Sequence, residues 1–148
     1  MLYPKESRTR EIKDLSGIWQ FKIDSENKGI HDNWQSKPLT DTIPMPVPAS
    51  YNDITQNAKI RDHIGYAWYE TKFNVPQRIF ADKNVILRFG SATHYAIVWL
   101  NGREIIRHKG GFLPFEADIT DNIDKTGSNN ILTVAVNNEL TWQTLPPG

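Results

Sequence analysis

Residues 94–108 have the sequence of a β-hairpin. Residues 94–100 are apolar on both faces, which is typical of a strand in the middle of a sheet. Asn101 and Gly102 follow at once, and these residue types readily adopt the positive φ angles that both central positions of a type I′ turn need. Residues 103–108 then supply the return strand. The hairpin predicts a sheet in which residues 94–100 form a central strand.

Short segments on both sides of the hairpin predict further strands. In most of them apolar and polar residues alternate with the period of two that a half-buried strand requires. Helical periodicity is weak, and the two helix candidates, at residues 32–36 and 79–82, are one turn each. The predicted strands lie at residues 19–23, 69–75, 84–89, 112–119 and 131–136. Short strands separated by Gly, Pro and Asn predict an all-β, antiparallel β-sandwich of about eight strands.

Residues 36–64 are the least regular part of the chain. They contain four prolines and few alternating residues. We expect a long, ordered connection over one end of the sandwich, with one strand near residues 42–47.

Composition excludes several classes of function. The 148 residues carry 17 Lys plus Arg and 17 Asp plus Glu, so no basic excess favours nucleic acid or an anionic membrane. There is no cysteine for a disulfide, a thiol nucleophile or a thiolate metal site. The charged N-terminus lacks a secretory signal, and no apolar run reaches the about 18 residues that span a bilayer. We therefore expect a soluble, cytoplasmic, single-domain chain.

Histidine spacing argues against a metal site, whereas the role of the aromatic residues stays open. The four histidines are not spaced as in zinc or metalloprotease sites, so no metal is expected. The five Trp, five Tyr and six Phe suit either core packing or the stacking of sugar rings on aromatic side chains.

Several motifs resemble the N-terminal domain of the β-glucuronidases of glycoside hydrolase family two. REIKDLSGIW at residues 10–19 and VPASYND at 47–53 are similar to the opening of these enzymes. WYE at residues 68–70 and VWLNG at 98–102 are shared more widely, including with β-galactosidases. GGFLPFEAD at residues 110–118 and NNELTWQTLPPG at 137–148 are similar to the glucuronidase form specifically. The resemblance covers nearly the whole chain.

The resemblance implies a larger parent enzyme. A jelly-roll-like sandwich of the galactose-binding-domain type comes first, followed by an immunoglobulin-like sandwich and a (β/α) barrel, both absent here. The parent is expected to hydrolyse β-D-glucuronides with retention, which needs two carboxyl groups about 5–5.5 Å apart. In the family both are glutamates of the barrel. We therefore expect no catalytic residue in this chain, no cofactor, and no activity of the chain alone.

The resemblance also implies that residues 1–148 form one sugar-binding-type domain that ends before the last strand of its sandwich. A missing strand leaves an unpaired sheet edge. We therefore expect the isolated chain to dimerise or to exchange strands. The expected partners are the remaining domains of the parent enzyme and further copies in a homo-oligomer, with carbohydrate as another ligand.

The loop before residue 68 carries three candidate contacts, Asp62, His63 and Tyr66. In the related β-galactosidases this loop reaches toward the active site. Substrate contact and ordering against a neighbouring domain both remain open for these residues.

Asn138 and Trp142 are the candidates near the other end of the chain. The pair Asn138-Glu139 has the order of the family's asparagine and acid/base glutamate, but it follows a sandwich-like strand. Its expected role is hydrogen bonding in the loop that leads to Trp142. Trp142 is expected to anchor a domain interface or to contact a sugar.

Two alternatives to the β-glucuronidase domain remain. A free-standing carbohydrate-binding module would show a planar aromatic platform on one face, whereas an enzyme domain would bury its aromatics in the core and in domain interfaces. The same domain of a β-galactosidase relative is the other alternative, which the motifs at residues 110–118 and 137–148 disfavour.

Overall fold

A computed structural model describes residues 3–76, 83–124, 126 and 129–144. Within them the chain forms eight β-strands and three short helical turns. The strands are β1 (Gly17–Ile23), β2 (Ile43–Val47), β3 (Tyr66–Phe73), β4 (Ile86–Phe89), β5 (Tyr95–Leu100), β6 (Arg103–Lys109), β7 (Phe115–Asp118) and β8 (Asn130–Asn137). The turns are the 3₁₀ helix η1 (Trp34–Ser36), α1 (Tyr51–Ile54) and α2 (Ala58–Arg61). The all-β prediction is confirmed.

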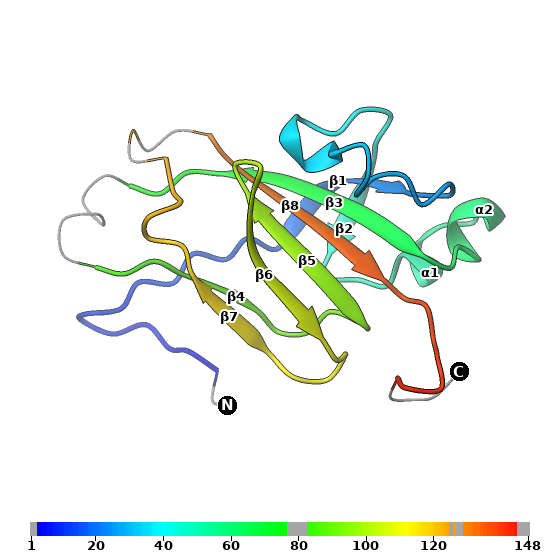
Figure 1. Ribbon diagram of the computed structural model, residues 1–148. Helices are drawn as coiled ribbons and strands as arrows, with labels where there is room; N and C mark the ends of the chain where they lie inside the picture. Colours follow the sequence, from blue (N-terminus) through cyan, green and yellow to red (C-terminus); the bar gives the residue numbers. More distant parts are fainter. Residues whose placement is uncertain (1–2, 77–82, 125, 127–128, 145–148) are drawn as a thin grey trace.

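The strands form two antiparallel sheets. The larger sheet has six strands in the order β2-β1-β3-β8-β5-β6, and β4 pairs with β7 in a second sheet. Figure 1 shows β4 and β7 beside β5 and β6. The antiparallel sandwich is confirmed, while jelly-roll connectivity stays a prediction.

The predicted hairpin is present as β5 and β6. Asn101 and Gly102 have φ angles of 53° and 80°, as the tight turn requires. The strand β8 pairs with the other side of β5, so β5 is an interior strand with five of its six residues buried. This position explains why its sequence is apolar on both faces.

The main core lies between the two sheets. The larger sheet contributes alternate residues of β5 and β8, and each strand of the second sheet contributes one buried residue. This core includes Val98, Leu100, Leu132, Val134, Leu87 and Phe115.

The outer face of the larger sheet is also covered, which the alternating pattern did not predict. Glu70, expected on a polar face of its strand, is 3% exposed. The backbone N–H of Leu39 donates to Glu70 Oε2 at 3.0 Å, and burial raises the pKa of this carboxyl group. Trp34, which precedes Leu39 in the same segment, packs on Trp68 of β3 with ring centroids 5.5 Å apart. The cover comes from residues 24–42, whose own sequence has no strand or helix period.

The irregular region contains the strand expected near residues 42–47, now β2. The helix candidate at residues 32–36 is represented by η1, and the candidate at residues 79–82 lies outside the described residues. The turns α1 and α2 were not predicted. The extended segment expected at residues 112–119 is a strand only from Phe115 to Asp118, after Pro114.

Candidate functional site

The side chain of Asn138 joins two loops at one end of the larger sheet. Its Oδ1 accepts a hydrogen bond from the Gly65 N–H at 2.9 Å. Its Nδ2 donates to Tyr51 Oη at 2.7 Å and to the His63 carbonyl at 3.0 Å. Tyr51 Oη in turn donates to the same carbonyl at 3.0 Å. We call these four residues the Asn138 junction. The expected hydrogen-bonding role of Asn138 is confirmed.

The backbone at Gly65 allows the chain to turn from α2 into β3. Its φ is +127°, a region that L side chains rarely adopt. Beyond the turn, His63 Nε2 lies 3.0 Å from the carbonyl oxygen of Tyr66, so this ring nitrogen carries the proton and donates. Two of the three predicted loop residues, His63 and Tyr66, are therefore held together beside Asn138.

Asp62 and Trp142 stand apart from this junction. Asp62 is exposed and pairs with Arg61, whose Nε and Nη2 donate to its two oxygens at 2.7 and 2.8 Å. These hydrogen bonds lower the pKa of Asp62. Trp142 is 90% exposed in the loop after β8 and does not pack in the core. An indole this exposed is available to a partner or a ligand.

Two members of the junction, Gly65 and Tyr51, were not candidates from the sequence, and Tyr51 is the one whose side chain takes part. It is 7% exposed, and burial raises the pKa of its phenol. Its ring packs against Phe21 of β1 with centroids 5.3 Å apart, which fixes the hydroxyl under the loop. No periodic signal marks Tyr51, because it lies in a one-turn helix within the irregular region.

The Asn138 junction holds loops in place and contains no group suited to acid–base or nucleophilic chemistry. Its amide, phenol and carbonyl groups satisfy one another, and no carboxylate takes part. Glu116 pairs with Arg88 on the second sheet, whereas Glu139 is exposed after β8, so these two carboxylates belong to different parts of the fold. Among the described residues no group of three or more His, Asp or Glu could hold a metal ion. No helix in the described chain is long and apolar enough to cross a membrane.

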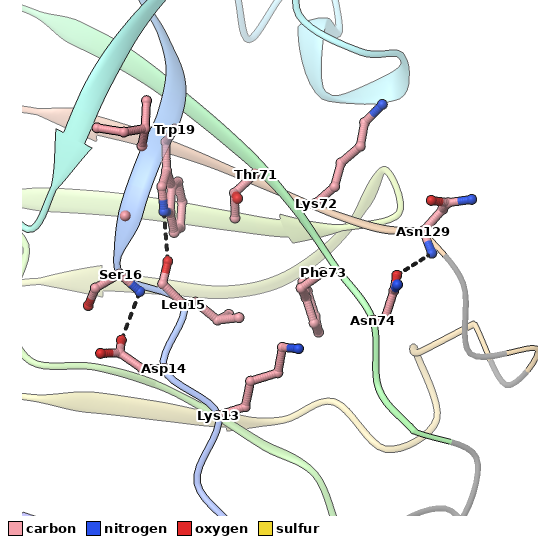
Figure 2. A pocket seen from close by; sticks show the side chains of 12 residues that line it. Lys13, Asp14, Leu15, Ser16, Trp19, Thr71, Lys72, Phe73, Asn74 and Asn129 are labelled. Atoms are coloured by element: carbon pink, nitrogen blue, oxygen red, sulfur yellow. Dashed lines mark hydrogen bonds between the residues drawn. The ribbon is translucent and has the colours of Figure 1, made fainter.

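A hollow of about 440 Å³ lies where residues 13–19 pass the end of β3 (Figure 2). Polar groups on its wall pair with each other, as in the 2.9 Å bond from Trp19 Nε1 to the Leu15 carbonyl. Figure 2 shows the ammonium groups of Lys13 and Lys72 apart from each other, on opposite sides of the β3 ribbon. The hollow therefore lacks a set of groups that converge on one ligand.

The tryptophans are mostly core residues. Trp19, Trp68 and Trp99 are 5%, 0% and 4% exposed. Trp34 packs on the outer-face cluster, which consists of Trp68, Ile97, Trp99 and Ala135. Core packing is thus confirmed for these side chains. No tryptophan platform covers the described surface.

Comparison with known proteins supports the motif resemblance. The family model described as "Glycosyl hydrolases family 2, sugar binding domain" matches residues 12–147. A β-glucuronidase of Paenibacillus borealis is 61% identical over 148 residues, which is 100% of this chain and 24% of that protein. Human β-glucuronidase is 47% identical over 159 aligned positions, with the same two shares covered.

A solved structure agrees with these sequence matches. The β-glucuronidase of an uncultured Clostridium sp. superposes with a TM-score of 0.94 at 55% identity, over 100% of this chain and 26% of that chain. The chain thus spans about a quarter of the length of these relatives.

Proposed function

The chain belongs to the sugar-binding domain family of the family 2 glycosyl hydrolases, and we propose that it serves as the N-terminal, non-catalytic domain of a β-glucuronidase. The observation that carries this proposal is the match of the whole chain to about a quarter of each β-glucuronidase relative. The parent enzyme hydrolyses β-D-glucuronides with retention, using carboxylates outside this chain. The identity of these relatives favours the β-glucuronidase over a β-galactosidase parent.

We propose that the Asn138 junction positions two loops of this domain for contact with the rest of the parent enzyme. It fixes the loop before β3 to the loop after β8, and apolar side chains project beside it. Ile64, Leu140 and Trp142 are 73%, 44% and 90% exposed. Exposed aromatic and aliphatic side chains on an ordered loop are typical of the centre of an interface. They dock the remaining domains of the parent enzyme, and the loops border its active site.

A fluorogenic β-glucuronide assay tests this role. We expect no turnover by the 148-residue chain and turnover by the chain extended through the downstream domains. In the extended enzyme, Trp142→Ala lowers kcat/KM by about 10- to 100-fold, because displaced loops misplace the substrate. Phe112→Ala is the matched control and should leave kcat/KM unchanged. Phe112 is also strongly exposed, at 72%, but it lies in the loop between β6 and β7. Turnover by the 148-residue chain would overturn the non-catalytic role, and Glu139 and Glu116 would then be mutated first.

We also propose that a further strand completes the sandwich, and that copies of the chain associate in its absence. Within the part of the chain that the structure describes, the second sheet has two strands against six in the first. On β4 the side chain of Ile86 is 50% exposed. The edge strand β2 carries Pro44 and Pro46, which lack the N–H that a new strand needs. The other edge strand of the larger sheet, β6, carries Arg103, Glu104, Arg107 and Lys109, and such charges disfavour pairing at an edge. The second sheet is therefore the favoured place for addition of a strand.

Sedimentation velocity checks this association. The 148-residue chain should shift from monomer to dimer as its concentration rises, and Ile86→Lys should shift the equilibrium back toward monomer. Ile18→Lys is the matched control, because Ile18 is 66% exposed on β1, away from the second sheet. A monomer at every concentration up to the solubility limit would contradict the proposal. Homo-oligomerisation of the parent enzyme is a separate proposal, tested on the extended chain.

A free-standing carbohydrate-binding module is the second candidate function. The observation that favours it is a pair of half-buried tyrosines, Tyr66 and Tyr95, on the outer face of the larger sheet.

A further inference from the structure

The turn between β5 and β6 carries the one Asn-Gly pair of the sequence. Of all the asparagines in the chain, only Asn101 is followed by glycine. Asparagine is among the residues that degrade chemically in proteins. Gly102 has no Cβ to shield its backbone nitrogen, so this nitrogen can reach the side-chain amide of the preceding residue. Asn101 is also exposed to water. The pair therefore combines the groups that deamidation of asparagine requires.

Deamidation at this pair needs only water and a solvent base. The Gly102 nitrogen gives its proton to the base and forms a bond to Asn101 Cγ. The bond between Cγ and Nδ2 breaks, and Nδ2 takes up a proton and leaves as ammonia. Water then opens the resulting succinimide ring at either of its two carbonyl groups. One opening yields aspartate, and the other yields isoaspartate, in which the main chain continues through Cβ and Cγ.

In the folded chain, hydrogen bonds to other segments hold the Asn101 side chain. Its Oδ1 accepts the Ile131 N–H at 2.9 Å. Its Nδ2 donates to the Asn122 carbonyl at 3.2 Å and to Asn130 Oδ1 at 3.0 Å. We call these four residues the Asn101 clamp. Attack by Gly102 requires Cγ to approach the backbone nitrogen and to become tetrahedral, so the bonds of the planar amide have to open first.

The Asn101 clamp ties the turn to the beginning of β8. The backbone N–H of Asn101 donates to the Ile131 carbonyl at 2.9 Å, beside the side-chain bond to the same residue. Asn130 is 0% exposed, and its Oδ1 also accepts the Asp124 N–H at 2.8 Å. Figure 1 shows the turn between β5 and β6 beside the start of β8. One partner of the clamp is therefore a buried, doubly bonded side chain.

A carboxylate at position 101 cannot restore these bonds. It has no N–H, so the Asn122 carbonyl and Asn130 Oδ1 would face an oxygen in place of Nδ2. Rotation of the Asn130 amide would present its Nδ2, which has no partner in the described chain, but would withdraw Oδ1 from the Asp124 N–H. Isoaspartate would in addition lengthen the main chain of a two-residue turn. Either product leaves the clamp open.

We propose that Asn101 is a deamidation site that the Asn101 clamp protects, and that the reaction releases the β5–β6 turn from the start of β8 irreversibly. The released turn lies between the central strand β5 and the edge strand β6. The inference is independent of the proposed domain role, because it concerns chemical change in the chain itself.

Peptide mapping by mass spectrometry tests the site on the 148-residue chain. Trypsin releases residues 89–103, in which Asn101 is the only side-chain amide. The chain is incubated at mildly alkaline pH, folded in buffer or unfolded in urea, and a sample without incubation corrects for reaction during digestion. We expect Asn101 to react at least about tenfold more slowly in the folded chain, because opening the clamp breaks several hydrogen bonds.

Asn57 is the internal control for the role of glycine. It is exposed and is followed by Ala58, whose Cβ shields the backbone nitrogen. In urea, where neither side chain is held, Asn57 should react more slowly than Asn101.

Substitution of Asn130 tests the protection by the clamp. Asn130→Ala removes one acceptor of Asn101 Nδ2 and should raise the rate at Asn101 in the folded chain by about five- to tenfold. Asn138→Ala is the matched control, because it breaks side-chain hydrogen bonds at the opposite end of β8. It should leave the rate at Asn101 unchanged, since the clamp opens locally. If Asn130→Ala does not fold, the comparison of folded and unfolded parent chain decides.

Asn101→Asp tests the release of the turn, because it reproduces the aspartate product. Hydrogen exchange of the Ile131 amide should become about tenfold faster, since its acceptor is no longer fixed by bonds to Asn122 and Asn130. Asn84→Asp adds the same charge at an exposed position before β4 and should leave this exchange unchanged.

Three results would overturn the proposal. Equal rates at Asn101 in the folded and unfolded chain would show that the clamp gives no protection. Faster reaction of another asparagine in urea would show that Asn101 is not the preferred site. Unchanged exchange of the Ile131 amide in Asn101→Asp would show that the product still closes the clamp.

Discussion

Replacing Asn138 with alanine is expected to lower the free energy of unfolding by about 2–3 kcal/mol, because three hydrogen bonds are lost together. The Gly65 N–H and the Tyr51 hydroxyl would each lose one partner. The effect should be concentrated in the loop before β3, which the Asn138 junction holds to the end of β8. Urea denaturation measures the stability, and hydrogen exchange of the Gly65 amide measures the local opening.

Asn138→Asp separates the two roles of the amide. Its carboxylate can still accept from the Gly65 N–H, but it can no longer donate to the His63 carbonyl. We expect the Gly65 amide to stay protected in Asn138→Asp and to exchange faster in Asn138→Ala. Asn84→Ala, at an exposed position before β4, is the control and should stay within about 0.5 kcal/mol of the parent chain. Equal exchange at Gly65 in all the variants would show that the junction does not order this loop.

The elements that could be predicted from sequence are those with local causes. The hairpin of β5 and β6 is specified by an apolar run and by the turn residues Asn101 and Gly102, all within a few positions. Strands β1 and β8 were similarly visible as β-rich runs between turn residues. Their boundaries moved by one or two residues, because pairing partners rather than local pattern decide where a strand ends.

The features that escaped prediction depend on contacts between distant residues. The cover of the outer face buries Glu70 through a bond to Leu39, 31 positions away. The Asn138 junction joins residues 87 positions apart, Asn138 and Tyr51. Neither pair has a sequence period. His63 and Asn138 were candidates from the sequence, whereas Tyr51, although it lies in the motif at residues 47–53, was recognised as part of the junction only in the fold.

Replacing Trp68 with alanine is expected to be the most destabilising change, by about 3–5 kcal/mol. Trp68 is 0% exposed and stacks on Trp99 at 5.2 Å with an angle of 10° between the rings. Its Nε1 lies 3.4 Å from Asp24 Oδ2, whose carboxylate also accepts the N–H groups of Lys28 and Gly29. The substitution therefore opens a cavity and loosens the segment that covers the outer face. Urea denaturation measures the loss.

Trp142→Ala is the matched control for this change. It removes the same side chain from a position that is 90% exposed, so stability should change by less than about 0.5 kcal/mol. A similar loss of unfolding free energy in Trp68→Ala and Trp142→Ala would mean that burial of Trp68 in the outer-face cluster does not contribute to stability.

Gly29→Ala tests the same contact from the opposite side. A Cβ at Gly29 would lie 2.6 Å from three atoms of the Trp68 indole, so we expect a loss of about 1–3 kcal/mol. The backbone of Gly29 is outside the left-handed region, which leaves the steric contact as the cause. Trp68→Leu removes the indole atoms that the methyl group would meet. The double variant should therefore be more stable, by about 1 kcal/mol, than the sum of the single losses predicts. If the stability losses of Gly29→Ala and Trp68→Leu simply add in the double variant, contact with the Trp68 indole is not the cause of the Gly29→Ala loss.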